Sequence, residues 1–190
     1  MRPLAFVFAI FVMGFGMNAA RAVDVGEKAP TFEATDDQGN TWKSADHIGK
    51  GVLVVYFYPA AMTGGCTKQA CGFRDDMKVL KDKGIEVVGV SGDEVRNLKF
   101  FKDAHELNFT LLSDEKGEIA NAFGVPVGKG NFVKAKINGK TETLKRGVTA
   151  KRWTFVIDKD GKIIAKNTKV VHPADDAKDV IKAVESKKSA

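Results

Sequence analysis

Cysteine and histidine are scarce in this sequence, which has two cysteines and three histidines among its 190 residues. A scaffold held by several disulfides is therefore excluded, and a chain of this length can bury a sizeable core without one. Internal repeats and low-complexity linkers are also absent, so we expect residues 23–190 to form one domain. The two cysteines, Cys66 and Cys71, are then free for chemistry.

Long hydrophobic runs are missing except near the N-terminus. An uncharged, largely apolar run from Leu4 to Met17 follows Arg2, and this run is short for a membrane span. Ala20-Arg21-Ala22 matches the small-x-small cleavage rule, so we interpret residues 1–22 as a secretory signal peptide. No cysteine follows the run, which excludes a lipoprotein anchor; an uncleaved anchor is the alternative. We expect export to a bacterial periplasm, with no stable membrane association after cleavage.

A large charge imbalance is absent as well. Removing Arg2 and Arg21 lowers the formal net charge from +6 to +4, with 28 basic residues against 24 acidic ones. Residues 129–152 are the exception, because Glu142 is the only acid among eight basic residues. This segment lacks interleaved stacking aromatics, so we exclude nucleic-acid binding. We interpret it as a solvated face, with steering of an acidic partner protein as the alternative. The basic residues are Lys129, Lys134, Lys136, Lys140, Lys145, Arg146, Lys151 and Arg152.

The apolar runs predict an α/β fold. The run VLVVYFY at 52–58 has no charge and suits a central strand buried on both faces. Strands first alternate with helices and later end in a hairpin and a helix, so we expect a mixed sheet with helices on both faces. Further strands are expected at 85–90 and 109–112. Helices are expected at 118–123, after Pro173, and after Asp93, which would be the N-cap of its helix. Hairpins are expected at 32–42 and 152–165, and an added β-ribbon is expected around Asn138-Gly139.

Both cysteines lie in the segment PAAMTGGCTKQAC, from Pro59 to Cys71, which follows the first apolar run. Apolar residues then recur at helical spacing and predict one helix over 66–80, with Cys66 in its first turn. Unpaired backbone N–H groups and the helix dipole favour a thiolate there, so Cys66 is a candidate nucleophile. The alternative is that Cys66 is a small buried hydrophobe. An ordinary thiol is roughly 3% ionised at pH 7, so ionisation raises reactivity only about 30-fold and other groups must act on the substrate.

The motif P-x-x-x-T-x-x-C, formed by Pro59, Thr63 and Cys66, is followed by Cys71 and much later by Arg152-x-Thr154-Phe155. This pattern resembles the peroxiredoxins, and the Cys-x-x-x-x-Cys spacing is similar to that of the peroxiredoxin Q group, also called bacterioferritin comigratory proteins. The resemblance covers the chain from about Ala29 to the C-terminal helix. The ribbon at 131–146 is longer than the usual connection.

The resemblance implies a thioredoxin-like fold and a thiol peroxidase that needs no metal or other cofactor. Cys66 would be the peroxidatic cysteine and Cys71 the resolving one, joined in a disulfide during each cycle. Pro59, Thr63 and Arg152 would complete the active site. Hydroperoxides would be the substrate, thioredoxin or a thioredoxin-like protein the reductant, and the protein would be a monomer.

On an intact helix, two residues five positions apart have Cα atoms roughly 8 to 9 Å apart. A disulfide tolerates about 4.4 to 6.8 Å, so the helix has to unwind before Cys66 and Cys71 can join. Gly72, a poor helix former, is well placed to permit this.

Three other functions are alternatives to the peroxidase. A thioredoxin-like copper carrier could use the two cysteines and His172, but opposite faces of one helix do not share an ion without unwinding. A general disulfide exchanger ordinarily carries Cys-x-x-Cys, which this chain lacks. A non-catalytic binding domain gives no reason for the set Thr63, Cys66 and Arg152.

Overall fold

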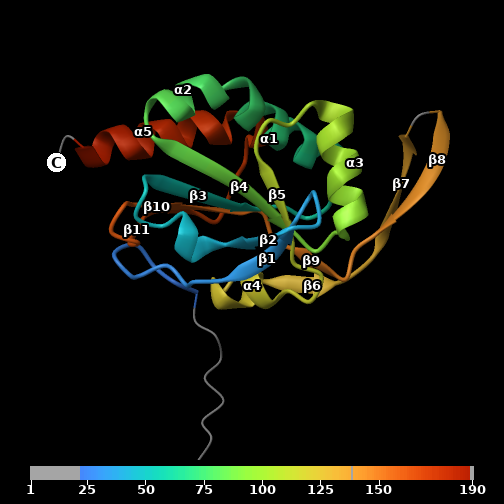
Figure 1. Ribbon diagram of the computed structural model, residues 1–190, viewed down its shortest axis with the longest axis horizontal. Helices are drawn as coiled ribbons and strands as arrows, with labels where there is room; N and C mark the ends of the chain where they lie inside the picture. The colour runs from blue at the N-terminus through green and yellow to red at the C-terminus, as the bar shows by residue number, and fades with distance from the viewer. Residues whose placement is uncertain (1–21, 138, 189–190) are drawn as a thin grey trace, which may run out of the picture.

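The computed structural model describes residues 22–137 and 139–188. The predicted signal peptide falls almost entirely outside these residues. A central sheet of seven strands has the order β11-β10-β3-β4-β5-β1-β2 (Figure 1). In chain order its strands are β1 Glu33–Asp36, β2 Thr41–Lys43, β3 Val52–Phe57, β4 Ile85–Ser91, β5 Thr110–Ser113, β10 Trp153–Ile157 and β11 Ile163–Asn167.

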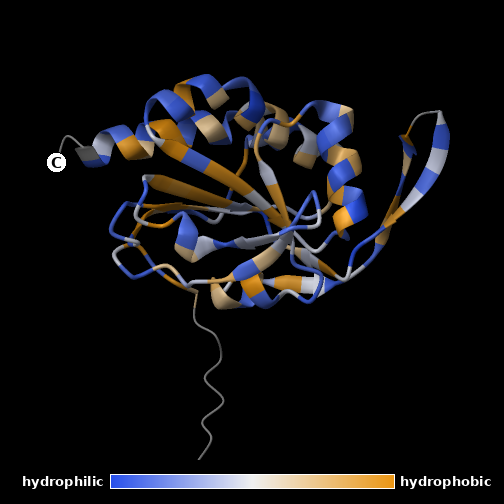
Figure 2. Cartoon of the chain, in the orientation of Figure 1, coloured by the Kyte–Doolittle hydropathy of each residue, from blue (hydrophilic) through white to orange (hydrophobic). Residues whose placement is uncertain are grey.

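Strand β3 lies in the middle of this sheet, as its uncharged sequence predicts. It pairs in parallel with β4 and antiparallel with β10, so the predicted mixed sheet is confirmed. Alternate side chains of β3 enter two separate cores, Val54 and Tyr56 on one face and Val55 and Phe57 on the other. Figure 2 shows the strongest hydrophobic colouring along these central strands. Because β3 is buried on both faces, it is held in the centre of the sheet, and the loop that follows Phe57 begins there.

Helices cover the two faces unequally (Figure 1). Four helices pack on the core that contains Val54 and Tyr56, and the short helix α4 packs on the other. Within the described part of the chain, none of the helices combines the length and apolar character needed to cross a bilayer. The four are α1 Gly64–Asp75, α2 Met77–Asp82, α3 Val95–His105 and α5 Asp176–Lys188, and α4 is Glu118–Ala122.

Four local predictions need correction. The single helix predicted over 66–80 is two helices, because the chain leaves helical geometry at Asp76, between α1 and α2. Asp93 does not cap α3, whose N-cap is Glu94. The segment after Pro173 begins as a 3-10 turn, η2 (Pro173–Asp175), before α5. The predicted N-terminal hairpin extends the sheet as β1 and β2 rather than only covering its edge; a second 3-10 turn, η1 (Ser44–Asp46), follows it.

The predicted ribbon is present as β7 (Phe132–Ile137) paired with β8 (Lys140–Lys145), and it projects from the body beside α3 (Figure 1). Its base is a short ladder between β6 (Val127–Lys129) and β9 (Val148–Ala150). Leu144 of the ribbon is buried, and an ion pair of Glu142 with Arg96 at 2.7 Å attaches the ribbon to α3.

Candidate active site

The loop from Pro59 to Thr63 leaves β3 and turns the chain into α1. Half-buried Pro59 follows the last buried tyrosine, and Ala60 and Ala61 are both buried. Met62 has a φ of 61°, a left-handed conformation that is rare outside glycine and is held only where the surroundings require it. The Thr63 hydroxyl donates to the Ala60 carbonyl at 2.9 Å and caps no helical N–H group. The loop is thus a tight, internally bonded turn.

The buried carboxylate of Asp93 holds this loop in place. Its Oδ2 accepts hydrogen bonds from the Ala61 backbone N–H at 2.8 Å and from the Ser91 hydroxyl at 2.8 Å. Burial raises the pKa of the Asp93 carboxyl, and the two hydrogen bonds oppose that rise. Sequence reasoning assigned Asp93 to a helix cap and missed this contact. The signal available in the sequence was an acidic residue between an apolar strand and a predicted helix.

Cys66 lies in the first turn of α1, as predicted, and is only 2% exposed. The backbone N–H groups of a helix's first turn have no acceptor within the helix, so they favour negative charge there. Arg152, from the segment before β10, donates from Nη2 to the Cys66 Sγ at 3.2 Å. A side chain at Gly65 would approach that Nη2 to 3.3 Å, so glycine leaves room for the guanidinium. The structure therefore brings the predicted pair Cys66 and Arg152 into direct contact across 86 residues of sequence.

A buried chain of polar groups continues behind Arg152. Its Nη1 donates to the side-chain carbonyl of Gln69, and the Gln69 amide donates to Asp176 Oδ2 at 2.7 Å. The Thr154 hydroxyl donates to the same oxygen at 2.7 Å. Burial raises the pKa of Asp176, while the bonds from Thr154 and Gln69 oppose the rise. Sequence reasoning missed Gln69 and Asp176; the signal available for Gln69 was a polar residue on the apolar face of the helix.

Cys71 lies in the same helix, two turns from the start, and is half-buried. Both thiols are free. With both residues on the continuous helix α1, the sulfur atoms cannot join until the turn between them opens. Gly72 follows directly, and a Cβ atom at this position would lie 2.4 Å from the Ala174 carbonyl oxygen of η2. Gly72 therefore permits a close contact between α1 and η2, a role that the sequence did not indicate.

Metal-binding residues do not converge in the described part of the chain, where no group of three or more histidine, cysteine or acidic side chains is placed to hold an ion. His172, weighed as a copper ligand, is the exposed residue before η2.

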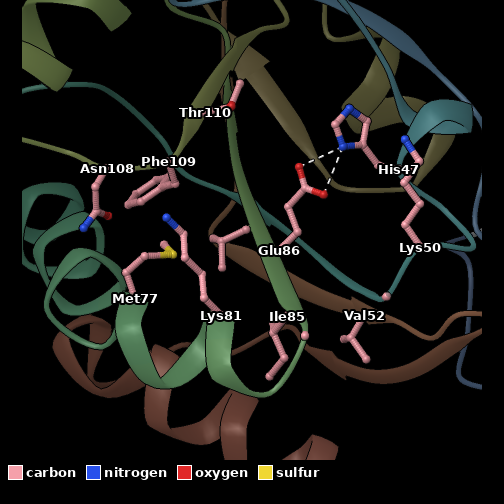
Figure 3. A pocket seen from close by; sticks show the side chains of 13 residues that line it. His47, Lys50, Val52, Met77, Lys81, Ile85, Glu86, Asn108, Phe109 and Thr110 are labelled. Carbon is pink, nitrogen blue, oxygen red and sulfur yellow. Dashed lines mark hydrogen bonds and ion pairs between the residues drawn. The ribbon is translucent and has the colours of Figure 1, made fainter.

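A separate pocket of about 430 Å³ lies at the other end of the central strands, near the first residues of β3 and β4 (Figure 3). His47 faces Glu86 there, with Nδ1 2.8 Å from a carboxylate oxygen. Cys66 follows the end of β3 rather than its beginning, so this pocket is distinct from the thiol site.

Comparison with known proteins gives consistent matches. Residues 25–166 match the AhpC/TSA family. Peroxiredoxin Bcp of Escherichia coli K12 is 45% identical over 147 residues, which are 77% of this chain and 85% of that protein. A putative peroxiredoxin of Mycobacterium tuberculosis is 44% identical over 148 residues, 78% of this chain and 87% of that protein.

Solved structures show the same similarity. The crystal structure of peroxidoxin BcpB from M. tuberculosis superposes with a TM-score of 0.71 at 33% identity, covering 85% of this chain and 96% of that chain. A bacterioferritin comigratory protein from Xanthomonas campestris, described as reducing alkyl peroxides, gives a TM-score of 0.68 at 26% identity, covering 86% and 99%.

Proposed function

Because this chain belongs to the AhpC/TSA family and is a peroxiredoxin, a thiol peroxidase with a thioredoxin-like fold, we propose that Cys66 is its peroxidatic cysteine and Cys71 its resolving cysteine. The observation that carries the assignment is the hydrogen bond from Arg152 Nη2 to the Cys66 Sγ at 3.2 Å. The arginine donates to the Cys66 sulfur, so Cys66 is the thiol held beside a hydrogen-bond donor and Cys71 is left for the later step.

In the first step, the Cys66 thiolate attacks the terminal oxygen of a hydroperoxide. The O–O bond breaks, Cys66 becomes a sulfenic acid, and the departing alkoxide or hydroxide takes a proton to leave as alcohol or water. Arg152 is placed to stabilise the charge that develops on the breaking bond, together with the free N–H groups of the first helical turn. The Thr63 hydroxyl donates to Ala60, so its oxygen lone pairs are available to accept the O–H of the substrate. Pro59, beside them in the loop, would help to exclude water.

In the second step, Cys71 attacks the sulfur of the Cys66 sulfenic acid. An S–S bond forms, the S–O bond breaks, and hydroxide leaves and is protonated to water. Helix α1 has to open between the two residues before this reaction, because the folded helix holds them too far apart. Peroxide attack thus uses the folded helix and disulfide formation uses an unwound one.

The substrates and the reductant complete the proposal. Hydrogen peroxide and organic hydroperoxides are proposed as substrates, which agrees with the alkyl peroxide reduction stated for the X. campestris protein. An external dithiol must reduce the disulfide, since the chain has no third cysteine. We assign that role to thioredoxin or a thioredoxin-like protein, and we propose that the enzyme acts as a monomer in antioxidant defence.

Export is a further part of the proposal. The apolar run from Leu4 and the Ala20-Arg21-Ala22 site support a signal peptide cleaved after Ala22, with residues 23–190 forming the mature domain. The reductant would then be an exported thioredoxin-like protein. The intact mass of protein recovered from the cell envelope tests this, and a full-length chain in the cytosol would contradict it.

Single-turnover kinetics of two matched variants test the assigned roles. We expect Cys66→Ser to consume no peroxide, because it removes the nucleophile. Cys71→Ser should complete one rapid turnover and stop at a sulfenic acid that a chemical trap captures. Stopped-flow measurement gives both rates, and equal initial rates in the two variants would contradict the division of roles.

A further inference from the structure

Asp176 is a buried acid that the proposed chemistry does not use. It is the first residue of α5, a position where an acidic side chain ordinarily faces solvent near the helix N-terminus. Here the residue is 1% exposed, and its Oδ1 has no hydrogen-bond partner among the described residues. A carboxylate buried in this way destabilises a fold unless its contacts compensate. The residue also lies beyond the segment 25–166 that matches the family.

The Gln69 amide connects Asp176 to Arg152. A carboxylate can only accept hydrogen bonds and a guanidinium can only donate them. The Gln69 side chain lies between the two, so its N–H group must face Asp176 and its carbonyl must face Arg152, as the structure has them. Without the carboxylate, the amide could rotate by 180° and direct an N–H group at the guanidinium, which offers no acceptor.

The orientation of Arg152 follows from that of Gln69. The guanidinium is a rigid fork, so holding Nη1 on the Gln69 carbonyl directs Nη2 at the Cys66 sulfur. We propose that Asp176 is a positioning residue of this enzyme, which acts through Gln69 to hold Arg152 against the reacting thiol. This inference rests on the proposed function of Cys66 and adds the C-terminal helix to its active site.

Asp176 also opposes disulfide formation. Gln69 lies between Cys66 and Cys71 in α1, so opening that part of the helix must break the bond from Gln69 to Asp176. Loss of the carboxylate should therefore affect the two steps differently. Peroxide attack slows because Arg152 is less well placed, and disulfide formation does not slow.

The test measures both steps in full-length protein by rapid-quench mass spectrometry. We expect Asp176→Ala to slow oxidation of Cys66 about tenfold, the effect of roughly one hydrogen bond, with disulfide formation as fast as in wild type or faster. Asp176→Asn should stay within about threefold of wild type, because an amide oxygen in the place of Oδ2 can accept both hydrogen bonds. Two controls on the same helix, Asp179→Asn for charge and Val180→Ala for loss of stability, should leave the oxidation rate unchanged.

A double-mutant cycle separates positioning from general destabilisation. In an Arg152→Met background, Asp176→Ala should slow the oxidation of Cys66 no further, because the residue through which it acts is gone. Equal slowing in both backgrounds, or no slowing in either, would overturn the proposal.

Nuclear magnetic resonance provides a test on the wild-type protein alone. It does not depend on whether a variant folds or on peroxidase activity. The Gln69 side-chain amide protons should exchange slowly with solvent, and an amide that exchanges like that of a free glutamine would overturn the proposal. A wild-type protein that reduces no peroxide would instead contradict the function proposed for Cys66, while the amide signal would still report on Asp176.

Discussion

The site around Cys66 and the ribbon β7–β8 both carry positive charge, and they hold it in opposite ways. At the Cys66 site, Arg152 is partly buried and touches both Cys66 and Gln69. The ribbon projects from the body of the molecule (Figure 1), and its residues Lys134 and Lys136 are exposed. The guanidinium of Arg152 is held in one orientation by its two partners, whereas the lysine ammonium groups of the ribbon are surrounded by water.

This difference sets the size of the effects that a substitution can have. A partly buried charge with two fixed partners loses directed hydrogen bonds when it is replaced, and those to charged groups are worth about 1.5 to 3 kcal/mol each. Exposed ion pairs contribute about 0 to 1 kcal/mol, and salt screens them. The two regions can therefore be compared by experiments ranked from large effects to small ones.

Arg152→Lys should have the largest effect. An ammonium is a point charge and cannot contact the Gln69 carbonyl and the Cys66 sulfur with the fixed geometry of a guanidinium. We expect the second-order rate of Cys66 oxidation to fall about 100-fold, close to the loss of one charged hydrogen bond. Stopped-flow kinetics with hydrogen peroxide measures this rate.

The neighbouring residue provides the control. Lys151 is exposed, so Lys151→Gln should leave the oxidation rate unchanged. If both variants kept the wild-type rate, Arg152 would be an ordinary surface cation and the contrast between the two regions would disappear.

The position of the thiol in the fold was largely predictable from the sequence. The uncharged run at 52–58 predicts a central strand, and the helical spacing after Gly65 places Cys66 in a first turn. Arg152 came only with the family resemblance, because no local pattern shows that a residue 86 positions away meets that sulfur. The break at Asp76 was missed because Met77 and Leu80 keep the apolar spacing across it.

The groups behind the thiol could not be predicted in the same way. Asp93 precedes a helix and Asp176 begins one, positions where acids are common, and only tertiary packing turns them inward. Gly72 illustrates the same limit. From sequence it is a weak point in a helix, whereas in the structure it allows α1 to lie against η2.

Gly72→Ala should have the second-largest effect, and this effect is on stability. We expect the variant to be less stable, whereas helix propensity alone predicts that it is more stable. Alanine favours a helix interior over glycine by about 1 kcal/mol. Its Cβ would lie 2.4 Å from the Ala174 carbonyl oxygen, and overpacking of this kind costs about 1 to 3 kcal/mol. Because the obstacle is backbone rather than a flexible side chain, we expect overpacking to prevail. The free energy of unfolding in urea should fall by up to about 2 kcal/mol, the difference between the two effects.

A second alanine on the same helix serves as the comparison. Lys68 is exposed, so Lys68→Ala should change the free energy of unfolding by less than about 0.5 kcal/mol. A Gly72→Ala protein as stable as wild type would mean that η2 moves aside without loss, and slower disulfide formation would then be the expected consequence of a firmer helix.

The smallest effect is expected on the ribbon, and it should appear in a different step. Lys134, Lys136 and Lys145 share one face, since the register pairs Phe132 with Lys145 and Lys134 with Thr143. All three are exposed, and the opposite face carries Leu144 toward the body. Charge in this position can attract an acidic reductant over a distance of about one Debye length but does not reach the reacting sulfur.

Replacing these three lysines with glutamine should therefore leave the oxidation of Cys66 unchanged and slow reduction of the disulfide by an acidic thioredoxin-like protein about threefold at low salt. In wild type the reduction rate should fall as salt is added, and in the triple variant it should depend less on salt, because the screened attraction is already lost. A control with the same change in net charge replaces Lys178, Lys182 and Lys187, which are exposed on α5. Equal slowing in the two triple variants would assign the effect to net charge alone, and unchanged reduction in the ribbon variant would leave its lysines as a solvated face.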